Sequence, residues 1–239
     1  MNVSIFIPCF IDQLYPHVGF NMVKVLEKAG CTVYYNPNQT CCGQPAFNAG
    51  FWGEAREVCS KWVDDFAEAE YIVSPSASCS GFVRNYFPKL MENSSLHNEV
   101  KQLREKTFEF AEFMVKVLKI DDVGAEFPAK ATYHDSCAGL REIGIKSEPR
   151  QLLSKVRGLE LVEMNDVETC CGFGGTFAVK FEPISVAMAD QKATNATNTG
   201  AEYLISTDMS CLMHLDGYMK KTGYPIKTIH IADVLASGW

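Results

Sequence analysis

The sequence predicts an α/β protein with two pseudo-symmetric, duplicated halves, each a small, mostly parallel sheet flanked by helices. Short runs rich in β-branched and aromatic residues alternate with stretches of helical periodicity, an order typical of parallel strand pairing. A group of four cysteines occurs twice within the 239 residues, in the same order and at nearly the same spacing. A repeat period near 125 residues is too long for a solenoid and indicates a duplicated domain.

The first half is predicted to contain three strands separated by two helices. Val3–Pro8, Thr32–Tyr35 and Tyr71–Ser74 are short runs of β-branched and aromatic residues. Between the first two strands, apolar residues from Val18 to Ala29 recur at the spacing of one helix face. A second helical stripe occupies Phe51–Phe66, ahead of the third strand.

The second half repeats this order. Ala131–His134, Leu159–Val162 and Tyr203–Ser206 are the predicted strands, and Glu148–Val156 and Glu182–Thr199 are the predicted helices between them. Because strands joined through helices pair in parallel, their carboxyl ends are expected at the same edge of each sheet.

A tail segment of each copy also repeats. Lys106–Glu112 matches Lys227–Asp233 at an offset of 121 residues, whereas the cysteines repeat at offsets of 128 to 132. The difference predicts a longer insertion in the first copy, around Met91–Lys101. The seam is expected at Asp121–Ala129, where Asp-Asp-Val-Gly precedes a proline, so that residues 1–122 and 123–239 form the two cysteine-rich halves.

Composition and charge argue against several classes of protein. With 47% apolar and 21% charged residues, the chain has the composition of an ordered globular protein. Its net charge of −7, without a run of Lys and Arg, argues against nucleic acid as a partner. Met1–Pro8 lacks the basic start and apolar length of a signal peptide, and no stretch resembles a transmembrane segment. A cytoplasmic protein with reduced cysteines is therefore expected.

Eight of the ten cysteines belong to the duplicated group. They are Cys9, Cys41, Cys42 and Cys79 in the first copy, and Cys137, Cys170, Cys171 and Cys211 in the second. The outer two cysteines of each copy follow predicted strands, and the adjacent pair lies between a strand and a helix. Four thiols per half are therefore expected to converge at the sheet edge where α/β proteins bind ligands.

Four chemical roles compete for these cysteines. Zinc ligands normally come as Cys-x₂₋₄-Cys pairs, which this pattern lacks. Structural disulfides are disfavoured in a reducing compartment, and a redox-active disulfide at each adjacent pair leaves the outer cysteines unexplained. An iron–sulfur cluster uses all four sulfurs, because adjacent thiolates can bind different irons. We therefore expect one cluster in each half, with zinc as the weaker alternative.

Each adjacent pair is followed by a glycine, Gly43 or Gly172. A residue without Cβ allows backbone amides to approach the sulfides of a cluster, although a tight turn at a helix start explains the glycines equally well. The run that begins at Gly172 does not match a nucleotide-binding loop, because Phe177 occupies the position of the third glycine.

The repeated pattern resembles the cysteine-rich CCG domain family, which includes the cysteine-rich subunit of heterodisulfide reductase and the iron–sulfur subunits of glycolate oxidase. Within that family, Ser74–Cys79, His134–Cys137 and Ser206–Cys211 are more similar still to lactate-utilization proteins. The resemblance covers essentially the whole chain. It implies a cytoplasmic iron–sulfur oxidoreductase subunit that works with two partner proteins in oxidising L-lactate to pyruvate.

One departure from the family concerns the last cysteine motif. The heterodisulfide reductase member has Cys-x-x-Cys there, which gives five cysteines per site for noncubane [4Fe–4S] clusters. In this sequence Ser76 and Asp208 take the first of those positions. Four sulfurs suffice for an ordinary [4Fe–4S] cubane, and each oxygen either ligates the cluster or caps a helix. The departure weakens any transfer of cluster type or of disulfide-reducing chemistry.

Three further residues have either a functional or a structural interpretation, and the two remaining cysteines have a structural one. His134 either hydrogen-bonds a ligating sulfur or ends its strand as a core histidine. Arg84 and Arg141 either offset the negative charge of a cluster or lie in solvent or in ion pairs. Cys31 and Cys59 are expected to be small core residues.

These observations predict a non-flavin, electron-transfer subunit, and the resemblance implies that it serves a complex that oxidises L-lactate or a related 2-hydroxy acid. Removing a hydride equivalent from lactate is normally the task of an organic cofactor, and the sequence carries no flavin or nicotinamide fingerprint. Two alternatives stay open. One is a thiol- or disulfide-reducing catalyst of the heterodisulfide reductase type, and the other is a zinc-stabilised scaffold subunit.

Overall fold

The computed structural model describes residues 1–239, and its strands and helices form two halves of the same design. The first half contains β1 (Asn2–Ile5), α1 (Cys9–Leu14), α2 (Pro16–Lys28), β2 (Thr32–Tyr35), α3 (Gln44–Asn48), α4 (Trp52–Phe66), β3 (Tyr71–Ser74), α5 (Ala77–Leu90), α6 (His97–Lys106), β4 (Thr107–Glu109), α7 (Phe110–Glu112) and a π-helical segment, η1 (Phe113–Leu118). The second half contains β5 (Glu126–Tyr133), α8 (Cys137–Glu142), α9 (Ser147–Leu153), β6 (Arg157–Leu161), α10 (Thr176–Lys180), α11 (Glu182–Thr197), β7 (Tyr203–Ser206), α12 (Met209–Thr222), β8 (Lys227–His230) and α13 (Ile231–Leu235).

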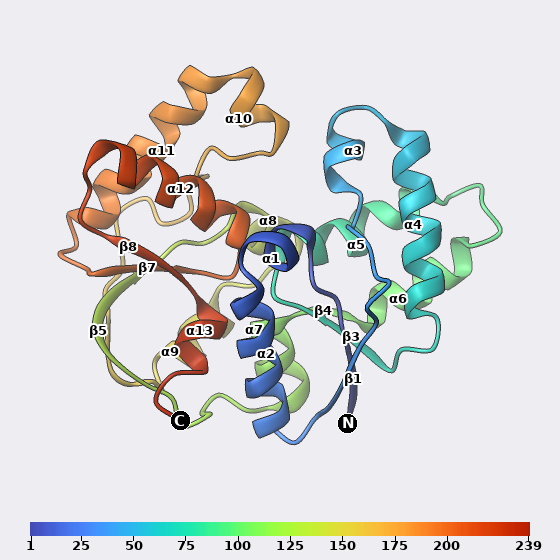
Figure 1. The fold of residues 1–239 in the computed structure, drawn as a ribbon, viewed down its shortest axis with the longest axis horizontal. Helices are drawn as coiled ribbons and strands as arrows, with labels where there is room; N and C mark the ends of the chain where they lie inside the picture. Colours follow the sequence, from blue (N-terminus) through green and yellow to red (C-terminus); the bar gives the residue numbers. More distant parts are fainter.

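Each half is built on a four-stranded parallel sheet. The strand order is β2-β1-β3-β4 in the first sheet and β6-β5-β7-β8 in the second, so the two sheets share one topology. This confirms the predicted α/β class with two similar halves. Figure 1 shows α3 and α4 on one side of the molecule and α10 and α11 on the other. In each sheet the strand order reverses beside the first strand, the place where open α/β sheets form binding sites.

The helices form where apolar residues recur along one face. In α2, Val18, Met22, Val25 and Leu26 are fully buried, one or two per turn. Pro16 opens this helix at a position where a missing N–H breaks no intrahelical hydrogen bond. No helix of the protein combines the length and the apolar composition needed to cross a lipid bilayer.

The predicted strands and helices are present, although several ends differ. β1 stops at Ile5, because Pro8 caps α1 instead of extending the strand. β5 begins at Glu126, within the segment expected to join the halves, and its register shifts between Glu126 and Ala129. A proline in this stretch, Pro128, indicated a connection, but a strand at an irregular register tolerates it.

Each sheet also has a fourth strand that was not predicted from the sequence. β4 and β8 lie in the repeated tail, and their sequences Thr-Phe-Glu and Lys-Thr-Ile-His lack the apolar composition of a buried strand. The expected insertion of the first half corresponds to α6 and the turn before it, since α12 of the second half leads to β8 without such a helix.

The two halves share one hydrophobic core. Its largest cluster contains 38 buried residues from both sheets, Val3 and Ala131 among them. The helix after the last strand of each half packs on the other half, α13 on α2 and α7 on α9. Asn21 of α2 donates to Asp233 of α13 at 2.8 Å. The halves are therefore interlocked. A second cluster of 17 buried residues lies in the first half alone and is rich in aromatic side chains.

Candidate metal centre

The four cysteines of the first half meet at the carboxyl edge of the first sheet. The Sγ atoms of Cys9 and Cys41 lie 3.6 Å apart, and those of Cys42 and Cys79 lie 3.5 Å apart. The adjacent thiols of Cys41 and Cys42 perturb each other's pKa values, which connects the two pairs. All four are free thiols, at separations well beyond the ~2.05 Å of a disulfide bond. The predicted convergence of four sulfurs therefore holds in this half.

The four cysteines of the second half meet in the same order. Consecutive thiols of this series perturb one another's pKa values, Cys137 with Cys170, Cys170 with Cys171, and Cys171 with Cys211, and the sulfurs of Cys171 and Cys211 lie within 4.8 Å of each other. In both halves the second cysteine of the adjacent pair and the last cysteine are buried, while the other two are partly exposed. Each group of thiols is thus held by the core on one side and reaches solvent on the other.

Helix N-termini surround both groups. Cys9 and Cys137 are the first residues of α1 and α8, and Cys79 and Cys211 lie in the first turns of α5 and α12. The N-terminus of a helix carries partial positive charge, which stabilises thiolates and other anions. Both sites are therefore suited to hold negative charge.

The thiol with the lowest pKa in each site is that of the first cysteine of the adjacent pair. Hydrogen bonds from thiols, that of Cys42 foremost, lower the pKa of Cys41 to about 3. The same arrangement, with Cys137 as the foremost donor, lowers the pKa of Cys170 to about 2. Each of these two sulfurs also accepts the backbone N–H of the glycine two residues further on, at 3.4 Å. In the metal-free protein, Cys41 and Cys170 are therefore the thiols that ionise most readily.

The glycines after the adjacent cysteines adopt a left-handed backbone. The φ angles of Gly43 and Gly172 are +85° and +92°. A Cβ at Gly172 would lie 2.7 Å from Ser185 O and 2.9 Å from Met188 Cβ, whereas one at Gly43 would lie 3.3 Å from Val58 Cγ1. The turn that aims each N–H at a sulfur requires glycine, most strictly in the second half.

Gly172→Ala is therefore expected to lower the free energy of unfolding by roughly 2 to 4 kcal/mol, through the left-handed backbone and the overlap with α11. Gly43→Ala is the matched control and is expected to cost roughly 1 to 2 kcal/mol, because the space around it is wider. Urea denaturation of the metal-free proteins measures both losses. A larger loss for Gly43→Ala would contradict this account.

Ser76 and Asp208 lie at the N-caps of α5 and α12. Ser76 Oγ accepts the N–H of Cys79 at 3.3 Å, and Asp208 Oδ1 accepts the N–H of Ser210 at 3.2 Å. Asp208 Oδ2 also accepts the N–H of Ser78, in the other half, at 2.8 Å. One carboxylate therefore joins the N-termini of two cysteine-bearing helices, a contact for which the sequence carries no local signal.

The elements that carry the two groups of thiols are in direct contact. The α5 helix of the first half packs on α8 of the second, and α1 of the first packs on α12 of the second. The rings of Phe10 and Phe173 meet edge to face, with centroids 5.7 Å apart. The two helix contacts are equivalent, because α5 corresponds to α12 and α8 to α1, as a pseudo-twofold arrangement of the halves requires.

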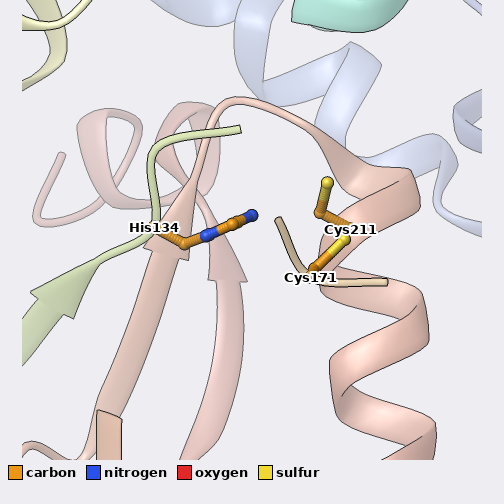
Figure 2. Close-up of side chains that lie close together, drawn as sticks. All are labelled: His134, Cys171 and Cys211. Atoms are coloured by element: carbon orange, nitrogen blue, oxygen red, sulfur yellow. The ribbon is translucent and has the colours of Figure 1, made fainter. Parts of the chain in front are cut away.

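His134 lies beside the second group, at the end of β5. One of its ring nitrogens and the sulfurs of Cys171 and Cys211 all lie within 4.8 Å of one another, and Figure 2 shows the imidazole directed toward the two sulfurs. The residue is fully buried, yet neither ring nitrogen has a hydrogen-bond partner. Burial lowers the pKa of His134 to about 3, so the ring is neutral. An unpartnered buried polar group is costly, which fits a side chain that contacts a bound metal group.

The remaining sequence candidates are engaged elsewhere. Cys31 and Cys59 are buried in the two core clusters. Arg84 forms an ion pair with Glu112 at 2.7 Å, and Arg141 donates to a backbone carbonyl at 3.1 Å. These contacts are those of structural residues.

Lys192 on α11 lies near the second site and was not predicted from the sequence. Its side chain is fully buried, and its Nζ donates to the carbonyls of Asp166 and Val167 at 2.6 and 3.1 Å, in the segment that leads to Cys170. Burial lowers the pKa of Lys192 to about 8. The available signal was its place on the buried stripe of α11, but a lysine on a helix is ordinarily assigned to the solvent face.

Comparison with known proteins connects this site to a family. The profile of the cysteine-rich domain CCG matches residues 3–84 and again residues 131–216. The chain belongs to the CCG cysteine-rich domain family. Each match contains one complete group of four thiols, so the two CCG domains coincide with the two sites.

Similar proteins match this CCG-family chain over nearly its full length. Lactate utilization protein A of Halalkalibacterium halodurans is 46% identical over 98% of the chain and 96% of its own length. The protein of the same name from an Exiguobacterium species is 46% identical over 99% of the chain and 98% of its own length. That of Geobacillus thermodenitrificans is 44% identical over 98% of each.

A solved structure supports the fold alone. A hypothetical protein from Helicobacter pylori superimposes with a TM-score of 0.64 at 11% sequence identity, over 98% of this chain. The chain spans about half of that protein, 48% of its length.

Proposed function

We propose that the protein is an iron–sulfur electron-transfer subunit with one [4Fe–4S] cluster in each half. Two groups of four convergent thiols, each at the carboxyl edge of a parallel sheet, carry the proposal. The ligands would be Cys9, Cys41, Cys42 and Cys79 for the first cluster, and Cys137, Cys170, Cys171 and Cys211 for the second.

The surroundings of the thiols suit such a group. Helix N-termini and the N–H groups of Gly43 and Gly172 offer positive potential and hydrogen bonds to sulfur, which raise the reduction potential of a cluster. His134 offers two unpartnered nitrogens beside the second site. When bound, a four-iron cluster accepts and releases one electron at a time. Ser76 and Asp208 would act as helix caps in this assignment.

The proposed substrate of the complex is L-lactate or a related 2-hydroxy acid, because the full-length relatives bear the name lactate utilization protein A. Oxidation of lactate to pyruvate releases two electrons and two protons. We assign to this chain the relay of the electrons and to partner subunits the removal of the hydride equivalent. The proposal places the complex in the cytoplasm, where cysteines stay available as ligands.

Metal and sulfide analysis tests the cluster. Protein purified without oxygen is expected to contain roughly eight iron atoms and eight acid-labile sulfides per chain. In the presence of its partner subunits, L-lactate is expected to bleach the visible absorption of the clusters, and the chain alone should show no such reduction by lactate.

Three outcomes would contradict the proposal. Stoichiometric zinc without sulfide would indicate a scaffold subunit. Protein that contains neither iron nor zinc, and that reduces disulfide substrates without its partners, would indicate a thiol–disulfide catalyst. Clusters that lactate does not reduce in the complete complex would remove the assignment to lactate oxidation.

A further inference from the structure

Helices α4 and α11 occupy equivalent places in the two halves. Their five buried positions match one for one at an offset of 130 residues, and a single match replaces an apolar residue with a charged one. The matches are Ala55 with Ser185, Cys59 with Ala189, Trp62 with Lys192, Val63 with Ala193, and Phe66 with Ala196. Lys192 therefore stands where the first half has a buried tryptophan.

Phe6 and His134 form a second equivalent pair. Each follows the first strand of its sheet, and its N–H donates to a carbonyl of the neighbouring strand, at 2.9 and 2.8 Å respectively. In the first half, Phe6 packs edge to face on Trp62, with ring centroids 5.8 Å apart, and both belong to the hydrophobic cluster that contains Cys42 and Cys79. His134 and Lys192 therefore occupy the positions that an aromatic pair has beside the first site.

The ammonium of Lys192 has no carboxylate partner. Its only hydrogen bonds are to the carbonyls of Asp166 and Val167, and it is fully buried. The nearby carboxylate of Asp135 is already held by an arginine in a bidentate ion pair. An unpaired buried charge is strongly unfavourable. Negative charge at Cys171 would act on Lys192 most strongly, ahead of the carboxylates of Asp166 and Asp135, so a negative group bound at the second site would supply its counter-charge.

We propose that the second site, with the buried ammonium of Lys192 behind it, stabilises negative charge on a bound group better than the first site does. A cluster held in the second site therefore has the higher reduction potential. The inference rests on the proposed function. Reduction adds one electron to the bound group, and a buried ammonium stabilises the added charge, whereas Phe6 and Trp62 do not. The reduction equilibrium of the two sites is expected to differ by about tenfold or more, where tenfold corresponds to 59 mV for one electron.

Single-site proteins test the order of the potentials. Cys42→Ala is expected to leave only the second cluster, and Cys171→Ala only the first. Anaerobic titration with dithionite, followed by electron paramagnetic resonance, gives the potential of each. The Cys42→Ala protein should have the higher value. Equal potentials, or the reverse order, would overturn the proposal.

A charge-removing variant tests the cause. Lys192→Met is expected to weaken reduction of the second cluster about tenfold and leave the first unchanged. Lys61→Met is the matched control, because Lys61 of α4 also donates to a carbonyl ahead of its cysteine pair, Asn38 O at 2.9 Å. Its side chain is 45% exposed and paired with Asp65, so neither potential should move. If Lys192→Met kept its iron and its potential, the residue would only support the loop, and the proposal would fail.

Iron and sulfide contents separate the two levels of failure. A chain that binds no cluster overturns the proposed function and this inference together. A chain with two clusters of equal potential overturns the inference alone. If Lys192→Met lost the second cluster, the comparison of the two single-site proteins, which retain Lys192, would still decide the order.

Discussion

Cys42→Ala is expected to remove about half of the bound iron and sulfide and to leave the rest in place. Each proposed cluster depends on four thiolates of one half, and Cys42 is a fully buried member of the first group, 3.5 Å from Cys79. The two groups draw on different strands and loops, so the second site should keep its metal. Iron and sulfide assays on protein prepared without oxygen measure the effect.

Cys59→Ala is the matched control for this variant. Cys59 is also fully buried in the first half, but it lies on α4 within the core and has no thiol neighbour in the site. Its replacement should leave both clusters in place. Cys171→Ala should remove the other half of the iron and sulfide, that of the second site, and leave the first cluster in place. Complete loss of iron in either single-site variant would show that one cluster spans both halves and would contradict the assignment of one cluster to each half.

Glu109→Gln is expected to stabilise the protein by roughly 4 kcal/mol at pH 8. Glu109 is fully buried at the N-cap of α7, where Oε2 accepts the N–H of Glu112 at 3.0 Å and Oε1 has no partner. Burial raises the pKa of Glu109 from 4.5 to about 8. The folded protein must therefore keep this carboxyl protonated or bury its charge.

The sign of the effect follows from proton binding. Between pH 4.5 and about 8 the folded state holds a proton on Glu109 that the unfolded state has lost, so stability falls as pH rises through this window. A glutamine keeps the cap and removes this dependence. Urea denaturation at pH 5 and pH 8 measures it: the variant should match the native protein at pH 5 and exceed it at pH 8. If the free energies of unfolding of the two proteins differed by the same amount at both pH values, the assignment of a protonated Glu109 would be wrong.

Much of the site follows from features that are local in sequence. The spacing of the cysteines and the strands before Cys9, Cys79, Cys137 and Cys211 suffice to predict two groups of thiols at sheet edges, and the structure brings these thiols together. Strands and helices such as β3 and α11 were predictable because their apolar periodicity is set by residues only a few positions apart.

Other features depend on contacts between residues far apart in the chain. The bond from Ser78 to Asp208 joins residues 130 positions apart, and the strands β4 and β8 are specified by their neighbours in the sheet more than by their own composition. The burial of Lys192 also depends on distant contacts, because α11 packs on α12 and the carbonyls of Asp166 and Val167 accept the hydrogen bonds of its ammonium. No local pattern reports such contacts.

The class of fold, the duplication and the thiols that each half contributes follow from periodicity, spacing and residue type. Three other features emerge only in the folded chain. The halves interlock through α2 and α13, Asp208 accepts hydrogen bonds at the N-terminus of a helix in each half, and a buried lysine lies behind the second site alone. The physical reason is that burial and hydrogen bonding across the interface depend on the packing of the whole chain, whereas strand and helix patterns are local.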